Sequence, residues 1–225
     1  MNPNKVSFIT CVDNESLYEE CLLYLRHLNC PEGMHLEYIA IRGAHSMAEG
    51  YNHGMRKSDA KYKVYLHQDF LAINKNIIMD IVSYFIKHPE TGMLGLAGCE
   101  KLPTSFLWIE AGVRYGSIAH ALEPECTTVS MYGKNADDSY AAAAAVDGMF
   151  MATQYDVDWR EDLFRGWHFY DISQCLEFRR SNLKIAVPNP PSPWGIHLCG
   201  IKELPRDYWH WKQVCQTEYK EFCGK

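Results

Sequence analysis

The chain has 225 residues, of which 47% are hydrophobic and 22% are charged, and its formal net charge is −6. This length and composition favour a globular protein with a sizeable core, and no stretch approaches the roughly 18 to 20 apolar residues of a membrane span. The acidic balance argues against nucleic-acid binding, which needs a basic face.

Over about residues 1–100 the chain alternates between predicted strands and predicted helices. Apolar runs predict buried strands over residues 5–12, 35–41, 61–66 and 92–99. Amphipathic spacing predicts helices over residues 16–28, 46–56 and 76–87, and Ser16 and Ser46 each begin a sequence with the form of a capping box. Because this alternation requires crossover connections, we expect an α/β fold with a mostly parallel central sheet flanked by helices.

The alternation fails in the second half of the chain. Residues 104–140 are predicted to be irregular or hairpin-like, and the later elements are a strand at 146–151, a helix at 170–182, a strand at 183–187, a proline-rich loop at 188–193 and a helix within 205–222. No segment has the composition of a linker. We therefore expect residues 1–225 to form one domain, with halves at about 1–100 and 101–200 and a C-terminal helix at 203–225.

The third predicted strand ends on two side chains that can bind a metal ion. Apolar residues lead to His67-Gln68-Asp69, and spacing of two residues places His67 and Asp69 on one face at the carboxyl edge of a strand. Ligands of open α/β sheets bind at that edge. A carboxylate there can hold Mg²⁺ or Mn²⁺, and such an ion can neutralise a diphosphate. The alternative is a hydrogen-bonded strand-end histidine beside an aspartate that caps a helix.

Further segments combine with His67-Gln68-Asp69 into a recognisable order. These are residues 8–15 (FITCVDNE), 39–46 (IAIRGAHS), 146–150 (VDGMF) and 164–172 (FRGWHFYDI). In this order they resemble a family 2 glycosyltransferase with the GT-A fold, and the resemblance runs from about Val6 to His197. It implies a single GT-A domain in which the first half binds a nucleotide sugar and the second half faces the acceptor.

The resemblance also implies a set of donor-binding residues. Arg42 and His45 replace the acidic residues that bind uridine in the family, which leaves the base open. Asn52 matches the asparagine that lines the family's nucleotide pocket, whereas Asp13 and Asn14 could instead form a turn that caps a helix. The implied nucleotide-sugar site consists of Thr10, Val12, Asn14, Glu15, Arg42, Asn52, His67 and Gln68.

Metal binding is implied by the position of His67-Gln68-Asp69, where the family has Asp-x-Asp. Asp69 would coordinate the divalent ion, Mn²⁺ or Mg²⁺, that bridges the donor diphosphate. His67 replaces the first acidic residue and is compatible with Mn²⁺. His197, after the proline-rich loop, resembles the late histidine that completes metal or diphosphate binding in many GT-A enzymes.

The acceptor side is implied by the segments 146–150 and 164–172. Asp171 stands at the position of the catalytic base, and Asp147, Gly148, Trp167 and His168 are the implied acceptor-binding residues. Gly148 would allow a sugar to approach closely, and Trp167 would offer it a flat apolar face. The alternatives are core packing for Trp167 and a polar helix start for Asp171. Tyr208, Trp209 and Trp211 could form an acceptor platform or a membrane-surface contact, with core packing as the default.

Together the resemblance implies a metal-dependent, inverting glycosyltransferase. It would transfer a sugar from a nucleotide-diphosphate donor to a hydroxyl of a saccharide or another acceptor. A UDP-sugar is the first candidate for the donor. The rival hypotheses are an inactive nucleotide- or sugar-binding protein on the same fold and a nucleotidyltransferase, although the latter would normally have a glycine-rich phosphate loop that residues 12–15 lack. Nine cysteines without a Cys-x-x-Cys motif and an N-terminus without a leader-like segment predict a cytoplasmic protein.

Overall fold

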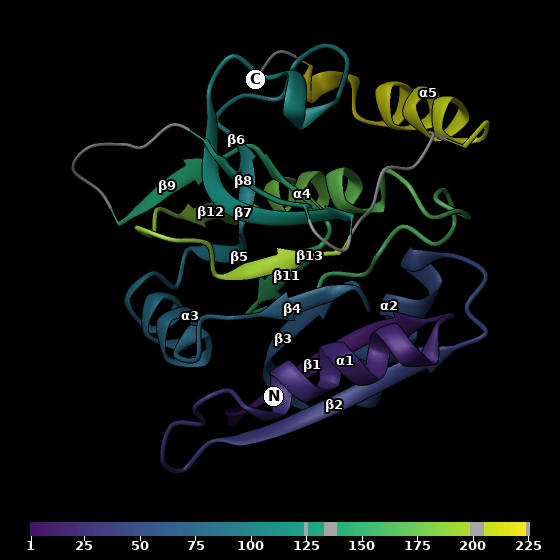
Figure 1. The fold of residues 1–225 in the computed structure, drawn as a ribbon. Helices are drawn as coiled ribbons and strands as arrows, with labels where there is room; N and C mark the ends of the chain where they lie inside the picture. The colour runs from purple at the N-terminus through teal and green to yellow at the C-terminus, as the bar shows by residue number, and fades with distance from the viewer. Residues whose placement is uncertain (124–125, 133–138, 199–204, 224–225) are drawn as a thin grey trace.

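The computed structural model describes residues 1–123, 126–132, 139–198 and 205–223 (Figure 1). The helices are α1 (Glu15–Arg26), α2 (Met47–Lys57), α3 (Ile77–Lys87), α4 (Tyr170–Arg180) and α5 (Tyr208–Glu218), with 3₁₀ turns at Trp108–Glu110 and Lys220–Phe222. The strands are β1 (Asn2–Val12), β2 (His35–Arg42), β3 (Ala60–Leu66), β4 (Phe70–Ala72), β5 (Thr91–Gly95), β6 (Ala97–Cys99), β7 (Arg114–Glu123), β8 (Cys126–Met131), β9 (Tyr140–Ala143), β10 (Ala145–Val146), β11 (Phe150–Thr153), β12 (Lys184–Pro188) and β13 (Gly195–His197).

A seven-stranded sheet forms the centre of the molecule, in the order β2-β1-β3-β11-β5-β12-β9. Strands β1, β2, β3, β5 and β12 run in one direction, whereas β11 and β9 run antiparallel to their neighbours. The expected mostly parallel α/β sheet is therefore confirmed. A six-stranded sheet lies beside it in the order β10-β6-β7-β13-β4, with β8 paired to β7. In Figure 1, β2 and α1 lie at one end of the molecule and α5 at the other.

Successive residues of the central strands face two different hydrophobic cores. On β1, Ile9 and Cys11 pack with α2 and α4, whereas Val6 and Phe8 pack with α1 and α3. Side chains alternate between the faces of a strand, so a strand that is covered on both faces must be apolar at almost every position. This explains why the central strands read as continuous apolar runs in the sequence.

Pairing between β11 and β3 brings the second half of the chain to the end of the third strand. Phe150 lies opposite Leu66 in the antiparallel register, and Met149 accepts a hydrogen bond from the backbone N–H of His67 at 3.1 Å. The turn at 147–149 therefore lies directly beside the residues that follow β3. Because β1, β2 and β3 are parallel, their carboxyl ends also meet at this edge.

Local structure differs from the sequence prediction at the start of the first helix. Asn14 is the N-cap of α1, and its side chain accepts a hydrogen bond from the backbone N–H of Leu17. The capping box predicted at Ser16 is therefore wrong, because Asn14 supplies the cap two residues earlier. The cap predicted at Ser46 is confirmed, since its hydroxyl accepts a hydrogen bond from the N–H of Glu49.

Two predicted strands, and the expected reason for the proximity of His67 to Asp69, also need correction. Residues 92–99 form β5 and β6 in different sheets, and residues 146–151 are interrupted by a turn between β10 and β11. Residues 67–69 form a turn after β3, so this turn, and not strand pleating, brings His67 close to Asp69. Strand β13 is too short to give a periodic signal. Among the described helices, none combines the length and apolar character needed to span a bilayer.

Candidate active site

Two adjoining cavities lie at the carboxyl end of β3. We call the first the β1–β2 cavity, of about 390 Å³, and the second the α4 cavity, of about 480 Å³. His67, Asp69 and Trp167 line both cavities and so mark their boundary. The α4 cavity has the size of an ordinary small-molecule site.

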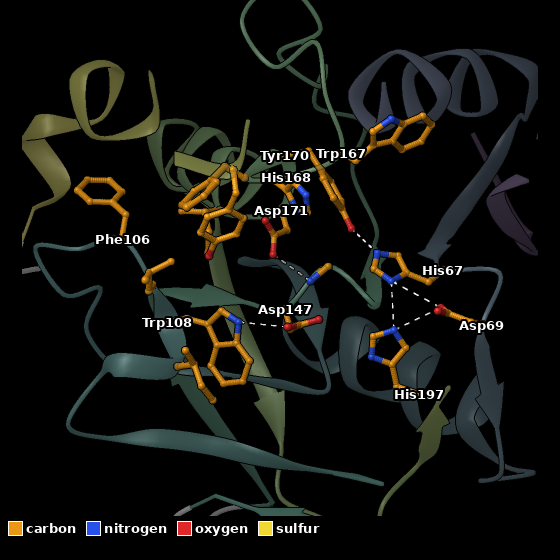
Figure 2. Close-up of a pocket in the computed structure, with 16 residues that line it drawn as sticks. His67, Asp69, Phe106, Trp108, Asp147, Trp167, His168, Tyr170, Asp171 and His197 are labelled. Atoms are coloured by element: carbon orange, nitrogen blue, oxygen red, sulfur yellow. Dashed lines mark hydrogen bonds and ion pairs between the residues drawn. The ribbon is translucent and has the colours of Figure 1, made fainter. Parts of the chain in front are cut away.

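Two of these boundary residues, His67 and Asp69, form with His197 a cluster that can hold a metal ion. His67 and Asp69 belong to the turn after β3, and the antiparallel pairing of β13 with β4 brings His197 to them. His197 Nε2 lies 3.3 Å from Asp69 Oδ1 and 3.4 Å from His67 Nδ1, and His67 Nδ1 lies 3.8 Å from Asp69 Oδ1. Figure 2 shows the three side chains pointing toward one another.

The chemistry of Asp69 fits a cation at this position. Its Oδ1 atom is buried and faces the imidazole nitrogens of His197 and His67. Burial by itself would raise the pKa of the Asp69 carboxyl, but the neighbouring His197 and His67 lower that pKa to about 2. A buried, ionised carboxylate oxygen and two imidazole nitrogens together form a suitable set of ligands for a divalent ion.

Across the α4 cavity, Asp171 lies at the start of α4. Its Oδ2 atom accepts a hydrogen bond of 3.1 Å from the backbone N–H of Gly148. A Cβ atom at position 148 would collide with the hydroxyl of Tyr170 and lie 2.9 Å from Cβ of Asp171. Glycine is therefore needed here so that the N-terminus of α4 can approach the turn, which differs from the close approach of a sugar that the sequence suggested.

The pKa of Asp171 differs strongly from that of an exposed carboxyl. Burial, and after it the negative charge of Asp147, together raise the pKa of Asp171 to about 7. Asp147 itself lines the cavity, where its Oδ2 accepts a hydrogen bond from Trp108 Nε1 at 3.2 Å and its Oδ1 accepts one from Met149 N at 2.9 Å. A carboxyl with a pKa near neutrality in a cavity is suited to proton transfer.

Aromatic side chains form much of the wall of the α4 cavity. Trp167 is 46% exposed, so its side chain lies at the surface, at the boundary of the two cavities, and is not part of the core. Burial lowers the pKa of His168, whose ring packs edge-on against Tyr208 of α5. Tyr208 lines the cavity as well, whereas Trp209 is 53% exposed and does not line it.

The β1–β2 cavity is formed by the ends of β1 and β2 and the start of α2. Val12 and Asp13 line it at the carboxyl end of β1, and Ile41 and Gly43 line it at the carboxyl end of β2. Gln68 also lines it, but its side-chain amide is already engaged. Gln68 Oε1 accepts hydrogen bonds of 3.0 Å from the backbone N–H groups of Asp13 and Asn14, and Gln68 Nε2 donates one to the Asp13 carboxylate. This cross-link fixes the turn that forms one wall of the cavity.

The other residues expected at the nucleotide lie outside the lining of both cavities. Arg42 and Glu15 pair with each other through Nε–Oε1 and Nη2–Oε2 contacts of 2.6 and 2.8 Å, and both side chains are more than half exposed. Asn14 caps α1 at the surface. Thr10 and Asn52 are each 1% exposed. Both polar groups of the Asn52 amide bond to the backbone of Trp159, so this side chain holds α2 to the loop that precedes α4.

Sequence reasoning missed several lining residues. Phe106 and Trp108 come from residues 104–140, which the sequence predicts to be irregular or hairpin-like, and no periodic pattern marks them. Tyr170 contacts His67 and lies immediately before Asp171, so it could have been found within the same motif. For Asp13 the sequence leaves both a ligand role and a helix-capping turn open, and the structure places it in a cavity wall.

The chain is similar to known proteins in family and in fold. The model of the glycosyltransferase-like family matches residues 7–219. No curated protein matches the chain in sequence. Among solved structures, residues 1–349 of S. aureus TarS share the fold with a TM-score of 0.54 and 12% identity, over 95% of this chain and 65% of that one.

Two further structures have the same fold. The mannosyltransferase PcManGT of Pyrobaculum calidifontis has a TM-score of 0.52 and 11% identity, over 97% of this chain and 62% of that one. A Drosophila beta-1,4-galactosyltransferase 7 has a TM-score of 0.55 and 11% identity, over 92% and 79%. The chain thus spans just under two thirds of the TarS and PcManGT structures. Because the family model covers nearly the whole sequence, the chain belongs to the glycosyltransferase-like family, and its fold is the GT-A fold.

Proposed function

We propose that this protein is a metal-dependent, inverting glycosyltransferase that moves a sugar from a nucleotide-diphosphate donor to an acceptor hydroxyl. One observation carries the proposal: the His67, Asp69 and His197 cluster lies at the boundary between two cavities, and Asp171 lines the second of them. This is the arrangement that a transfer between two bound substrates requires, because the diphosphate must be stabilised where the two sites meet.

The donor nucleotide would occupy the β1–β2 cavity, with its diphosphate beside Asp69. A divalent ion, Mn²⁺ or Mg²⁺, held by His67, Asp69 and His197 would supply the positive charge that neutralises the leaving diphosphate. Solved structures with the same fold support this class of donor: TarS was solved with UDP-GlcNAc, and PcManGT with GDP-Man and Mn²⁺. A UDP-sugar is the first donor to test.

The acceptor would occupy the α4 cavity. There Asp171 takes the proton of the acceptor hydroxyl as that oxygen attacks the anomeric carbon from the face opposite the leaving diphosphate, which inverts the anomeric configuration. Its pKa of about 7 supports this role, because at neutral pH about half of this carboxyl is ionised and that carboxylate is more basic than an exposed one. Trp167 and Tyr208 offer flat surfaces against which a sugar ring packs, and a saccharide is accordingly the proposed acceptor.

The proposal is tested by a thermal-shift screen of the full chain with UDP, GDP, CDP and TDP, each with Mn²⁺, Mg²⁺ or a chelator. We expect one nucleotide to raise the melting temperature in a metal-dependent way, and Asp69→Ala to abolish the rise. Glu15→Ala is the matched control, since this carboxylate pairs with Arg42 outside both cavities. No response to any nucleotide would count against the proposal.

A second assay separates the enzyme from an inactive binding protein. The corresponding nucleotide sugar is incubated with the protein and the metal ion, and release of the nucleoside diphosphate is followed with and without candidate sugar acceptors. Turnover that is lost in Asp171→Asn while nucleotide binding is kept supports the transferase. Binding without turnover under all conditions would favour the inactive alternative, for which the replacement of an acidic residue by His67 is the motivating observation.

A further inference from the structure

We propose that Tyr170 is a positioning residue of the metal site, which fixes the ring of His67 so that one nitrogen is presented to the ion. This inference rests on the metal dependence of the proposed function and goes beyond it by assigning a role outside the three ligands. The observation behind it is a hydrogen bond of 2.5 Å between the Tyr170 hydroxyl and His67 Nε2 (Figure 2).

The two nitrogens of His67 face two different partners. Nδ1 lies 3.4 Å from His197 Nε2 and 3.8 Å from Asp69 Oδ1, on the side of the metal cluster. Nε2, on the opposite side of the ring, faces Tyr170. A hydrogen bond at Nε2 therefore fixes the direction in which Nδ1 points, because the ring is rigid.

Tyr170 is itself held by its surroundings. It is 4% exposed, and its ring packs against Tyr51 and Trp159 with centroid separations of 5.8 and 6.1 Å. Gly148 leaves the space that the Tyr170 hydroxyl occupies, since a Cβ atom there would collide with it. The position of the hydroxyl is thus fixed by packing. A group that orients another side chain must be fixed in this way.

The chemistry of an imidazole ligand explains why such a group is needed. To bind a cation, Nδ1 must offer a lone pair, so in the neutral ring Nε2 carries the proton and donates it to the Tyr170 oxygen. Partners of this kind fix the tautomer and the orientation of a ligating histidine, and their loss typically costs about 10- to 100-fold in metal affinity. A carboxylate at position 67 would offer two oxygens and would depend less on such a partner.

The test is a titration of the full chain with Mn²⁺, in which free Mn²⁺ is measured by electron paramagnetic resonance without any substrate. We expect Tyr170→Phe to bind Mn²⁺ about 10- to 100-fold more weakly than the wild type. Tyr51→Phe is the matched control: it deletes a hydroxyl from the same aromatic cluster, and that hydroxyl has no hydrogen-bond partner among the described residues. Its affinity should equal that of the wild type. Equal affinity in Tyr170→Phe would overturn the inference.

A second measurement does not depend on any variant folding. In the metal-free wild type, nitrogen NMR of the imidazole should show His67 in the form with the proton on Nε2, and a proton on Nδ1 would overturn the inference. Failure of the wild type to bind Mn²⁺ would instead refute the metal dependence of the proposed function, and this inference with it. Retained binding in Tyr170→Phe refutes the positioning role alone.

Discussion

Replacing Asn52 with alanine distinguishes a structural clamp from a nucleotide ligand. The side chain is 1% exposed and donates to the Trp159 carbonyl at 2.8 Å while it accepts from the Trp159 N–H at 2.9 Å. The substitution leaves both backbone groups without a partner in a dry interior, because Trp159 is 2% exposed. Each such group costs about 1 to 3 kcal/mol, so for the two groups together we expect the free energy of unfolding to fall by about 2 to 6 kcal/mol.

The assay is equilibrium urea unfolding, followed by nucleotide binding under conditions in which the variant is folded. Asn14→Ala is a useful comparison, since this exposed cap should contribute only about 1 kcal/mol. The clamp predicts a large loss of stability for Asn52→Ala with unchanged nucleotide affinity. An unfolding free energy within about 0.5 kcal/mol of the wild type, combined with weaker nucleotide binding, would refute the reasoning and restore Asn52 to the donor site.

Three further predictions concern the candidate site. The transfer rate should rise with pH to a plateau, with a midpoint of about 7, as Asp171 ionises. Asp147→Asn should move this midpoint to lower pH because it removes a neighbouring negative charge. A flat profile between about pH 5 and 8 would exclude Asp171 as the base. Two imidazoles and one carboxylate should bind Mn²⁺ more tightly than Mg²⁺ in calorimetric titrations. His67→Asp should reduce this preference for Mn²⁺ by about tenfold. An unchanged ratio of the Mn²⁺ and Mg²⁺ affinities would show that His67 is not a ligand. Gly148→Ala should lower the free energy of unfolding, measured by urea titration, by about 1 to 3 kcal/mol, since the added Cβ meets the Tyr170 hydroxyl. A stability equal to that of the wild type would contradict the observed packing.

The motif match does not show which of the implied donor residues face a ligand and which face another side chain. Arg42 and Glu15 lie at the positions that the resemblance implies, yet they form an ion pair on the surface, and Gln68 holds the neighbouring turn. Each of these side chains is polar and follows or precedes a strand, so the sequence cannot distinguish one that faces a ligand from one that faces another side chain. That distinction depends on the neighbours that the fold brings near.

The sequence alone determined the α/β class and the approximate site. Continuous apolar runs such as β1 and β3 mark strands that are buried on both faces, and the cap at Ser46 marks the start of α2, because these signals depend only on local chemistry. The proximity of His67 and Asp69 was also visible, although a turn and not the strand pleat creates it.

Only the tertiary structure decided how the site is assembled. His197 reaches Asp69 because β13 pairs with β4, and Tyr170 reaches His67 because Gly148 admits the start of α4. The near-neutral pKa of Asp171 likewise arises from burial and from the charge of Asp147. Contacts between segments that are distant in the chain depend on which surfaces pack together, and periodicity and local propensity carry no information about that choice.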